Sequence, residues 1–233
     1  MTQAPAYDHY EKMKGWDAAP FMATPPGDRK FYDHYLGHCG LAGAVVVEVG
    51  FGNGNFLGWA QARGATLYGT EVQPEAVARA QDHGVHVLPP DLAQSSAELE
   101  GQVAVMAALD VMEHLSIAQN AAMLAASADM LRVGGLILLR FPNGQSPLSL
   151  PVQHGDMTHV SVLSIPVVEQ LCAGLPFKVT HAGPPFRTLP DGFAARLVRR
   201  IQGLIRRCAD ACIKAVYGDI PLYANVTMVL QKL

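Results

Sequence analysis

The stretch VVVEVGFGNGNFL, residues 45–57, begins with a run of β-branched residues. A turn with glycine at every second position follows that run. Glu48, Gly50, Gly52 and Gly54 form the pattern E-x-G-x-G-x-G. Glycine allows a tight turn and lets main-chain N–H groups come close to a ligand, and a helix that begins after Gly54 would favour a carboxylate at its N-terminus. The stretch therefore predicts a buried strand that ends in a ligand-binding turn.

Outward from this stretch, apolar strands alternate with helices. The expected strands are VVVEV (45–49), TLYGTEV (66–72), VHVL (85–88), VAVMAAL (103–109) and LILLRF (136–141). Three of the expected helices end at a glycine: Gly64, Gly84 and Gly101. A fourth, longer helix is expected to begin with a capping box of Ser116 and Gln119 and to end at the VGG of residues 133–135. Such an alternation indicates a parallel sheet covered on both faces, here a doubly wound α/β core over about residues 43–143.

Composition limits the classes of protein that this chain can represent. Its 233 residues are 50% hydrophobic and 16% charged, which indicates a compact globular fold. The net charge of −3 argues against a dedicated nucleic-acid binder. We find no run of 18 apolar residues and no apolar signal-peptide core near the N-terminus, so we expect a cytoplasmic protein. The four cysteines lack zinc-site spacing and are expected to be free thiols.

The acids around the glycine turn narrow the choice of nucleotide ligand. A dinucleotide fingerprint counted from Gly50 requires glycine where the chain has Asn55, and a P-loop requires a Gly-Lys pair that is absent. Glu48 would repel a pyrophosphate but suits a ligand with a cationic ammonium and sulfonium. Glu71, at the end of the second strand, can accept both hydroxyls of a ribose. The pattern favours a positively charged nucleoside.

Five segments resemble the class I S-adenosylmethionine-dependent methyltransferases. They are VEVGFGNG (47–54), YGTEVQPEAVARA (68–80), LPPDL (88–92), LDVMEHL (109–115) and MLRVGGLILLRFPNG (130–144). The fourth is similar to the family's Asp-Val-Leu-Glu-His-Leu signature. The resemblance implies a Rossmann-like seven-stranded sheet with an antiparallel last strand and helices on both faces. It implies S-adenosylmethionine as the cofactor.

The same resemblance implies the cofactor contacts. The methionine part would be held by Glu48, Gly50, Phe51, Gly52 and Gly54. Glu71 would bind the ribose hydroxyls, with Val72 against the base, and Asp91 and Leu92 would lie at the adenine. Leu109 and Asp110 would lie near the methionine and the sulfonium. Two of these acids have a structural alternative. Glu48 could be a solvated strand end, and Asp91 could cap a helix.

Three histidines are candidates for a general base: His114, His154 and His159. The segment HGDMTHVSVLS (154–164) resembles a Gly-Asp-x-Thr-His element of methyltransferases encoded among polysaccharide genes, and related Thr-His elements of coenzyme Q-type O-methyltransferases. We therefore predict His159 as the base with Asp156 orienting it, and a structural or cofactor-proximal role for His114. Alternatively, His159 packs under the loop and donates to the main chain. A metal site of His154, Asp156 and His159 lacks a fourth ligand, so no metal is predicted.

Two pieces flank the predicted core. Residues 1–42 form an aromatic arm that either covers the cofactor as a lid or packs into the core, and residues 43–233 form the methyltransferase domain. A helical insertion is expected at about 184–220, between the last two strands. Its amphipathic helix, 196–217, is expected to cover the protein's own sheet or a partner subunit in a homodimer. Contact with an anionic membrane surface is the less favoured alternative.

The chain is thus predicted to be a methyltransferase that acts on a small-molecule or glycan acceptor and not on nucleic acid. The preferred reaction is O-methylation of a hydroxyl on a sugar or glycan intermediate. Alternatives are O-methylation of a small phenolic or carboxylate metabolite, and a non-catalytic cofactor-binding module. A nicotinamide-dependent dehydrogenase is disfavoured by Asn55 and Glu48.

Overall fold

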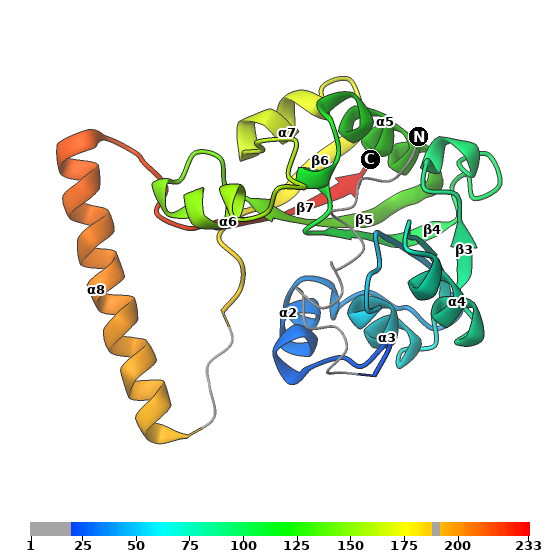
Figure 1. Ribbon diagram of the computed structural model, residues 1–233, viewed down its shortest axis with the longest axis horizontal. Coiled ribbons are helices and arrows are strands. Elements are labelled where there is room, and N and C mark those ends of the chain that lie inside the picture. Colours follow the sequence, from blue (N-terminus) through cyan, green and yellow to red (C-terminus); the bar gives the residue numbers. More distant parts are fainter. Residues whose placement is uncertain (1–19, 188–191) are drawn as a thin grey trace.

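A computed structural model describes residues 20–187 and 192–233 as one α/β domain built on a seven-stranded sheet (Figure 1). The strands are β1 (Val45–Val49), β2 (Thr66–Thr70), β3 (His86–Leu88), β4 (Val103–Leu109), β5 (Leu131–Pro142), β6 (Phe177–Gly183) and β7 (Asn225–Lys232). Their order across the sheet is β3-β2-β1-β4-β5-β7-β6. The predicted Rossmann-like sheet is confirmed.

The strand directions follow the chain's two halves. β1 pairs in parallel with both β2 and β4, so the chain winds outward in one direction through β3 and then in the other through β5. β7 inserts between β5 and β6 and is antiparallel to both, as predicted for the last strand. The strand order therefore reverses between β1 and β4, where ligands of open α/β sheets bind.

Helices cover both faces of the sheet, and the central strands contribute side chains to a hydrophobic core on each face. On one face lie α2 (Pro26–Leu36), α3 (Asn55–Gln61) and α4 (Pro74–Asp82), and on the other lie α5 (Ile117–Met130) and α7 (Ile165–Leu171) (Figure 1). Val46 belongs to the first core and Val47 to the second, because side chains alternate along a strand. Strands buried on both faces read as the continuous apolar runs seen in the sequence.

Two helix boundaries differ from the prediction. The long helix begins with the predicted capping box of Ser116 and Gln119, but it ends at Met130, and Leu131 already pairs with β4. The VGG signal of residues 133–135 thus lies inside β5, where the register with β4 shifts. The helix expected to close at Gly101 is only a 3₁₀ turn, Leu92–Gln94, followed by turns. A short helix, α6 (Leu150–His154), precedes the histidine-containing loop.

The described part of the N-terminal arm is packed onto the glycine turn. Met22 donates its main-chain N–H to the carbonyl of Asn53 at 2.8 Å. A Cβ on Gly58 would lie only 1.9 Å from the Met22 carbonyl oxygen, so only glycine allows this close approach. In α2, Tyr32 is buried, with its ring 5.5 Å from that of Phe56. Residues 1–19 of the arm, with three of its aromatic residues, lie outside the described part.

The helix α8 (Phe193–Tyr217) projects from the domain (Figure 1). None of its 25 residues is buried. The expectation that it covers the protein's own sheet is therefore wrong. Apolar residues at helical spacing define which face of an amphipathic helix is apolar, but they do not define what covers that face. In the part of the chain that the structure describes, no helix is both long and apolar enough to span a bilayer.

Candidate functional site

A cavity of about 860 Å³ opens where the strand order reverses. The carboxyl ends of β1, β2 and β4 and the glycine turn form its walls, and α2 and α5 contribute side chains from either side. It is large enough to hold a nucleoside-sized ligand. Its position agrees with the rule for open α/β sheets.

The structure brings together the predicted cofactor residues, with one exception. The predicted cofactor residues that line the cavity are Glu48, Gly50, Phe51, Gly52, Glu71, Val72, Asp91, Leu92, Leu109 and Asp110. The exception is Gly54, which caps α3 with φ of 69°. A Cβ there would lie 2.9 Å from the Met22 side chain, so this glycine makes room for the arm. Asp91 also accepts a hydrogen bond from the Ala93 N–H at 3.1 Å, so it both caps the 3₁₀ turn and faces the cavity.

The glycine turn has a backbone shape that other residues rarely adopt. Gly50 and Gly52 have φ of 63° and 50°. Gly50 donates its N–H to the hydroxyl oxygen of Thr70 at 3.2 Å, which ties the turn to β2. A Cβ on Gly50 would lie 2.7 Å from a methyl group of Val111. Both the left-handed backbone and the close packing therefore require glycine at this position.

Glu71 is held at the rim of the cavity by main-chain donors. One carboxylate oxygen accepts from the Gly52 N–H at 2.9 Å, and the other accepts from the Val72 and Gln73 N–H groups at 2.7 and 3.1 Å. Three such bonds fix the orientation of the side chain. A carboxylate group is thereby placed beside the glycine turn.

Glu48 is a buried carboxyl at the base of the cavity. It is 5% exposed, and one of its oxygens accepts from the Leu57 N–H at 3.3 Å. Burial raises its pKa well above the usual glutamate range, the Leu57 hydrogen bond opposes this, and the nearby Glu71 adds to it. The solvated strand end considered from the sequence is excluded.

The raised pKa of Glu48 predicts a pH-dependent stability. Between the ordinary glutamate pKa of about 4.3 and the raised value, the folded state holds a proton that the unfolded state has lost, so stability falls as pH rises. Glu48→Gln keeps a side-chain oxygen that accepts from the Leu57 N–H, and it removes the loss of stability at higher pH because glutamine does not titrate. We expect Glu48→Gln to become progressively more stable than the wild type as pH rises from 4 to 7, and the two proteins to be equally stable near pH 4.

Thermal and urea unfolding across that pH range measures this effect, with the exposed Glu98→Gln as the charge-matched control. A Glu48→Gln curve parallel to that of the wild type would contradict the assignment.

Sequence reasoning missed an ion pair in the wall of the cavity. Arg140, in β5, donates to both carboxylate oxygens of Asp110 at 3.0 Å through Nε, and its Nη2 lies 2.5 Å from one of them. Burial opposes the charged guanidinium, but the Asp110 carboxylate outweighs it, and the pKa of Arg140 is raised. The pair holds Asp110 in a left-handed backbone with φ of 56°. A lone arginine in the apolar run LILLRF was the available signal.

The arm contributes two further cavity residues that the sequence did not identify, Asp28 and Tyr32. Asp28 accepts from the side-chain amide of Asn55 at 3.0 Å, which links α2 to the start of α3. Burial raises the pKa of the Tyr32 hydroxyl, and the carboxyls of Glu48 and Asp28 raise it further. Tyr32 is therefore a neutral hydrogen-bonding group among acids, and the arm is part of the wall of the cavity.

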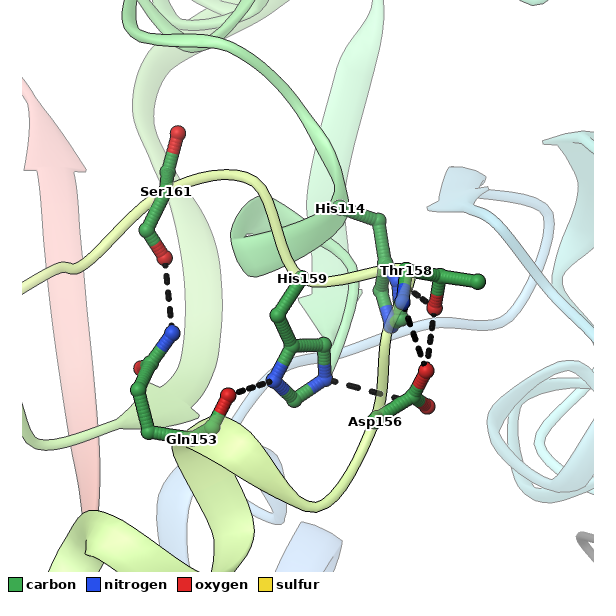
Figure 2. A network of polar contacts seen from close by, with 6 residues as sticks. All are labelled: His114, Gln153, Asp156, Thr158, His159 and Ser161. Carbon is green, nitrogen blue, oxygen red and sulfur yellow. Dashed lines mark hydrogen bonds and ion pairs between the residues drawn. The ribbon is translucent and has the colours of Figure 1, made fainter.

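A polar network joins the two histidine-containing segments (Figure 2). The Thr158 hydroxyl donates to Asp156 at 2.5 Å, and its oxygen lies 2.9 Å from His114 Nδ1. Because the only hydroxyl hydrogen goes to Asp156, His114 Nδ1 must donate to Thr158. In the neutral ring the lone pair is then on Nε2. Among the predicted catalytic residues, His114 is the one that lines the cavity.

His159 and Asp156 lie behind His114 and not on the wall of the cavity. His159 Nδ1 lies 3.0 Å from the carbonyl oxygen of Gln153, so it donates to the main chain, as the structural alternative predicted. Its Nε2 is 3.9 Å from Asp156, and its ring packs edge-on against His114 with centroids 4.7 Å apart (Figure 2). Its side chain is 5% exposed. The geometry thus favours His114 over His159 as the group that meets an acceptor.

The loop that carries Asp156 is attached to the end of β4. The Val160 and Ser161 N–H groups donate to the Glu113 carbonyl at 2.9 and 3.1 Å. Among the described residues, Glu113, His114 and His159 offer ligand atoms within 4.8 Å of one another. His154 is outside this group, so the His-x-Asp-x-x-His set considered from the sequence does not come together.

The fold and the cavity can now be compared with known proteins. The family model described as a methyltransferase domain matches residues 29–182. This chain belongs to the methyltransferase domain family. The methyltransferase uses S-adenosylmethionine as its cofactor. The match begins within α2, so it includes the part of the arm that contains Tyr32.

Solved structures share this fold at low sequence identity. An S-adenosylmethionine-dependent methyltransferase from Archaeoglobus fulgidus matches with a TM-score of 0.65 and 16% identity, over 88% of this chain and 92% of that one. A cyclopropane synthase from Mycobacterium tuberculosis gives 0.59 and 16%, over 88% and 84%. A geranyl diphosphate C-methyltransferase from Streptomyces coelicolor gives 0.56 and 14%, over 100% and 94%. No curated protein matches this methyltransferase.

Proposed function

We propose that this methyltransferase methylates a hydroxyl group of a sugar or glycan intermediate, with His114 as the general base. One observation carries the proposal. His114 lines the same cavity as the cofactor residues, and Thr158 and Asp156 fix its Nδ1 as a donor. A basic Nε2 is what a neutral hydroxyl acceptor requires, because the hydroxyl must lose its proton as it attacks.

The chemistry of the cavity fits the cofactor. Glu48 and Glu71 place acidic groups at the base and the rim for an ammonium and a ribose diol, and Val72 is an apolar side chain beside them for a base. When bound, S-adenosylmethionine supplies an activated methyl group, and the electron pair of the breaking carbon–sulfur bond stays on sulfur. The acceptor oxygen forms the new bond and its proton passes to His114 Nε2. Alignment and exclusion of water are the protein's main contributions.

Binding of the cationic cofactor should be coupled to Glu48. Because this carboxyl has a raised pKa, it must release a proton before it can offer a negative charge to the ammonium group. Cofactor affinity is therefore expected to increase with pH up to that pKa, and Glu48→Gln should abolish the dependence. Calorimetry in buffers of different ionisation enthalpy measures the released proton. An affinity of the wild type that does not vary with pH would contradict the role of Glu48.

The acceptor class rests on the segment 154–164, which resembles elements of methyltransferases encoded among polysaccharide genes. The second candidate is a small phenol or carboxylate. A carboxylate needs no base because it is already deprotonated, so the position of His114 in the cavity favours a hydroxyl. A cytoplasmic location and a homodimer stay predictions.

Two measurements test the proposal. Calorimetry with S-adenosylmethionine and with a nicotinamide dinucleotide tests the cofactor, and the proposal expects binding of the first only. Release of S-adenosylhomocysteine with a panel of glycosides, phenols and carboxylates then tests turnover. Cofactor binding without turnover on any acceptor would favour the non-catalytic module, and turnover on phenols alone would favour the second candidate.

A further inference from the structure

The helix α8 carries a strong positive charge on an acidic protein. Over Phe193–Tyr217 there are six basic residues, Arg196, Arg199, Arg200, Arg206, Arg207 and Lys214, against one acidic residue, Asp210. Elsewhere the chain has 11 basic and 19 acidic residues, because the whole chain has 17 and 20. The positive charge is therefore concentrated on a helix that projects from the domain (Figure 1).

The opposite face of α8 is apolar and exposed. At about 100° per residue, one broad stripe contains Leu197, Val198, Ile201, Leu204, Ile205 and Val216. These side chains are between 48% and 70% exposed. Aromatic residues mark both ends of the helix, Phe193 and Tyr217, which are 83% and 73% exposed. A strongly cationic face, a large apolar face and terminal aromatic residues are typical of helices that lie in the plane of a membrane interface.

The sheet places α8 on the catalytic side of the molecule. The chain leaves β6 after Gly183, which pairs with Thr227, and re-enters β7 at Asn225, which pairs with Pro142 at the end of β5. Both connections therefore leave the sheet at the edge where the parallel strands end. The cofactor cavity opens at that same edge.

A second apolar surface lies at this edge. The segment that follows β5 exposes Leu148, Leu150, Val152, Met157, Val160 and Val162, with Met157 86% and Val160 65% exposed. It includes α6, which lies on the side of the domain facing α8 (Figure 1). It also carries Asp156 and Thr158, which hold His114. Exposed apolar side chains thus lie on the same segment as the residues that hold His114.

We infer that α8 lies on an anionic lipid bilayer and that this surface presents the acceptor to the cavity. The inference rests on the proposed function and specifies it: the acceptor is a glycan intermediate attached to a membrane lipid. Anionic headgroups pair with the arginines while the acyl region receives the apolar stripe, so one partner satisfies both faces. The six exposed side chains of 148–162 would meet the same surface.

A second copy of this helix fits the charges less well. If two such helices formed a coiled coil, Leu197, Ile201 and Leu204 would occupy the a and d positions of the contact. Arg200, Arg207 and Lys214 would occupy the g positions on one side of this contact, and Val198 and Ile205 the e positions on the other. Antiparallel pairing would bring two such basic flanks together, and parallel pairing would set them against Val198 and Ile205. Lys214 is paired with Asp219 of its own chain at 2.6 Å, and neither arrangement provides an acid for Arg200 or Arg207. Charge complementarity therefore selects an anionic surface.

Co-sedimentation of the full chain with vesicles tests the inference. We expect binding to vesicles of equal parts phosphatidylglycerol and phosphatidylcholine, little binding to phosphatidylcholine alone, and weakening by salt. Leu204→Glu, on the apolar stripe, should weaken binding at least about tenfold. Its control is Gly203→Glu, which makes the same charge change on the cationic side, where a Cβ meets nothing within 4 Å. This control should retain most of the binding.

Two outcomes would overturn the inference: no binding to the anionic vesicles, or equal weakening of binding by both substitutions. If the vesicles capture nothing and analytical ultracentrifugation shows a dimer that Leu204→Glu dissociates, the apolar stripe pairs with a second copy instead. Calorimetry with S-adenosylmethionine shows whether each variant is folded, since neither position touches the cavity. If vesicle binding fails while the cofactor binds and a soluble glycan is methylated, the proposed function stands and only the membrane inference is lost.

Discussion

Replacing His114 with asparagine is expected to lower kcat by about 10²–10⁴-fold and to leave cofactor affinity nearly unchanged. Asparagine keeps a side-chain N–H that can donate to Thr158 but has no basic nitrogen to accept the acceptor's proton. The measurement is S-adenosylhomocysteine release with the acceptor found in the panel, beside calorimetry for the cofactor. The limb of the pH–rate profile that reports the base should also disappear in this variant.

The two neighbours of His114 are the controls for this prediction. Thr158→Val removes the hydroxyl that fixes Nδ1 and should reduce kcat by about tenfold while the pH limb survives in shifted form, because the base remains but is less well oriented. His159→Asn should affect stability more than kcat, since His159 donates to the Gln153 carbonyl away from the cavity. If His159→Asn abolishes turnover and His114→Asn does not, the base assigned from the sequence is correct and ours is wrong.

Gly50→Ala is expected to weaken cofactor binding by at least about tenfold and to lower the free energy of unfolding by about 2 kcal/mol or more. A left-handed backbone costs an alanine roughly 1–2 kcal/mol. The new Cβ would also lie 2.7 Å from a Val111 methyl group, so the turn or the residues that follow β4 must shift. Either shift moves the main chain that faces the cofactor.

Gly84→Ala separates backbone strain from the packing effect. Gly84 has φ of 77°, but a Cβ there meets nothing within 4 Å and the position is outside the cavity. In urea unfolding, Gly84→Ala should lower the free energy of unfolding by the cost of the strained backbone alone, about 1–2 kcal/mol. In calorimetry, this variant should keep the cofactor affinity of the wild type. Equal affinity losses at the two positions would show that the turn at Gly50 does not contact the cofactor.

Local sequence signals predicted most of the sheet and the cofactor wall, for a physical reason. Strands buried on both faces must be apolar throughout, and the turn at Gly50 needs a positive φ. Each of these two requirements restricts the residue types at a few consecutive positions, so it can be recognised in the sequence. The capping box at Ser116 was found in the same way. The end of that helix was misplaced because the glycines of VGG were interpreted as a helix stop, while pairing with β4 draws Leu131 and its successors into β5.

The network of His114, Thr158 and Asp156 shows what such local signals do not determine. Gly-Asp-x-Thr-His pointed to the loop of residues 154–164, but the sequence could not say which histidine faces the cavity. That depends on Val160 and Ser161 docking on the Glu113 carbonyl, a contact between segments more than forty residues apart. Likewise, the pairing of Asp110 with Arg140 joins two adjacent strands. Spacing along the chain does not contain this information.

What the sequence alone determined is the methyltransferase core: its strands, its glycine turn and the acids of the cavity wall, because short-range backbone and burial requirements restrict residue types at consecutive positions. Only the tertiary structure decided that His114 reaches the cavity, that α2 supplies Asp28 and Tyr32, and that α8 covers none of the sheet. These depend on which segments meet in space, since an amphipathic face requires a partner without specifying which one.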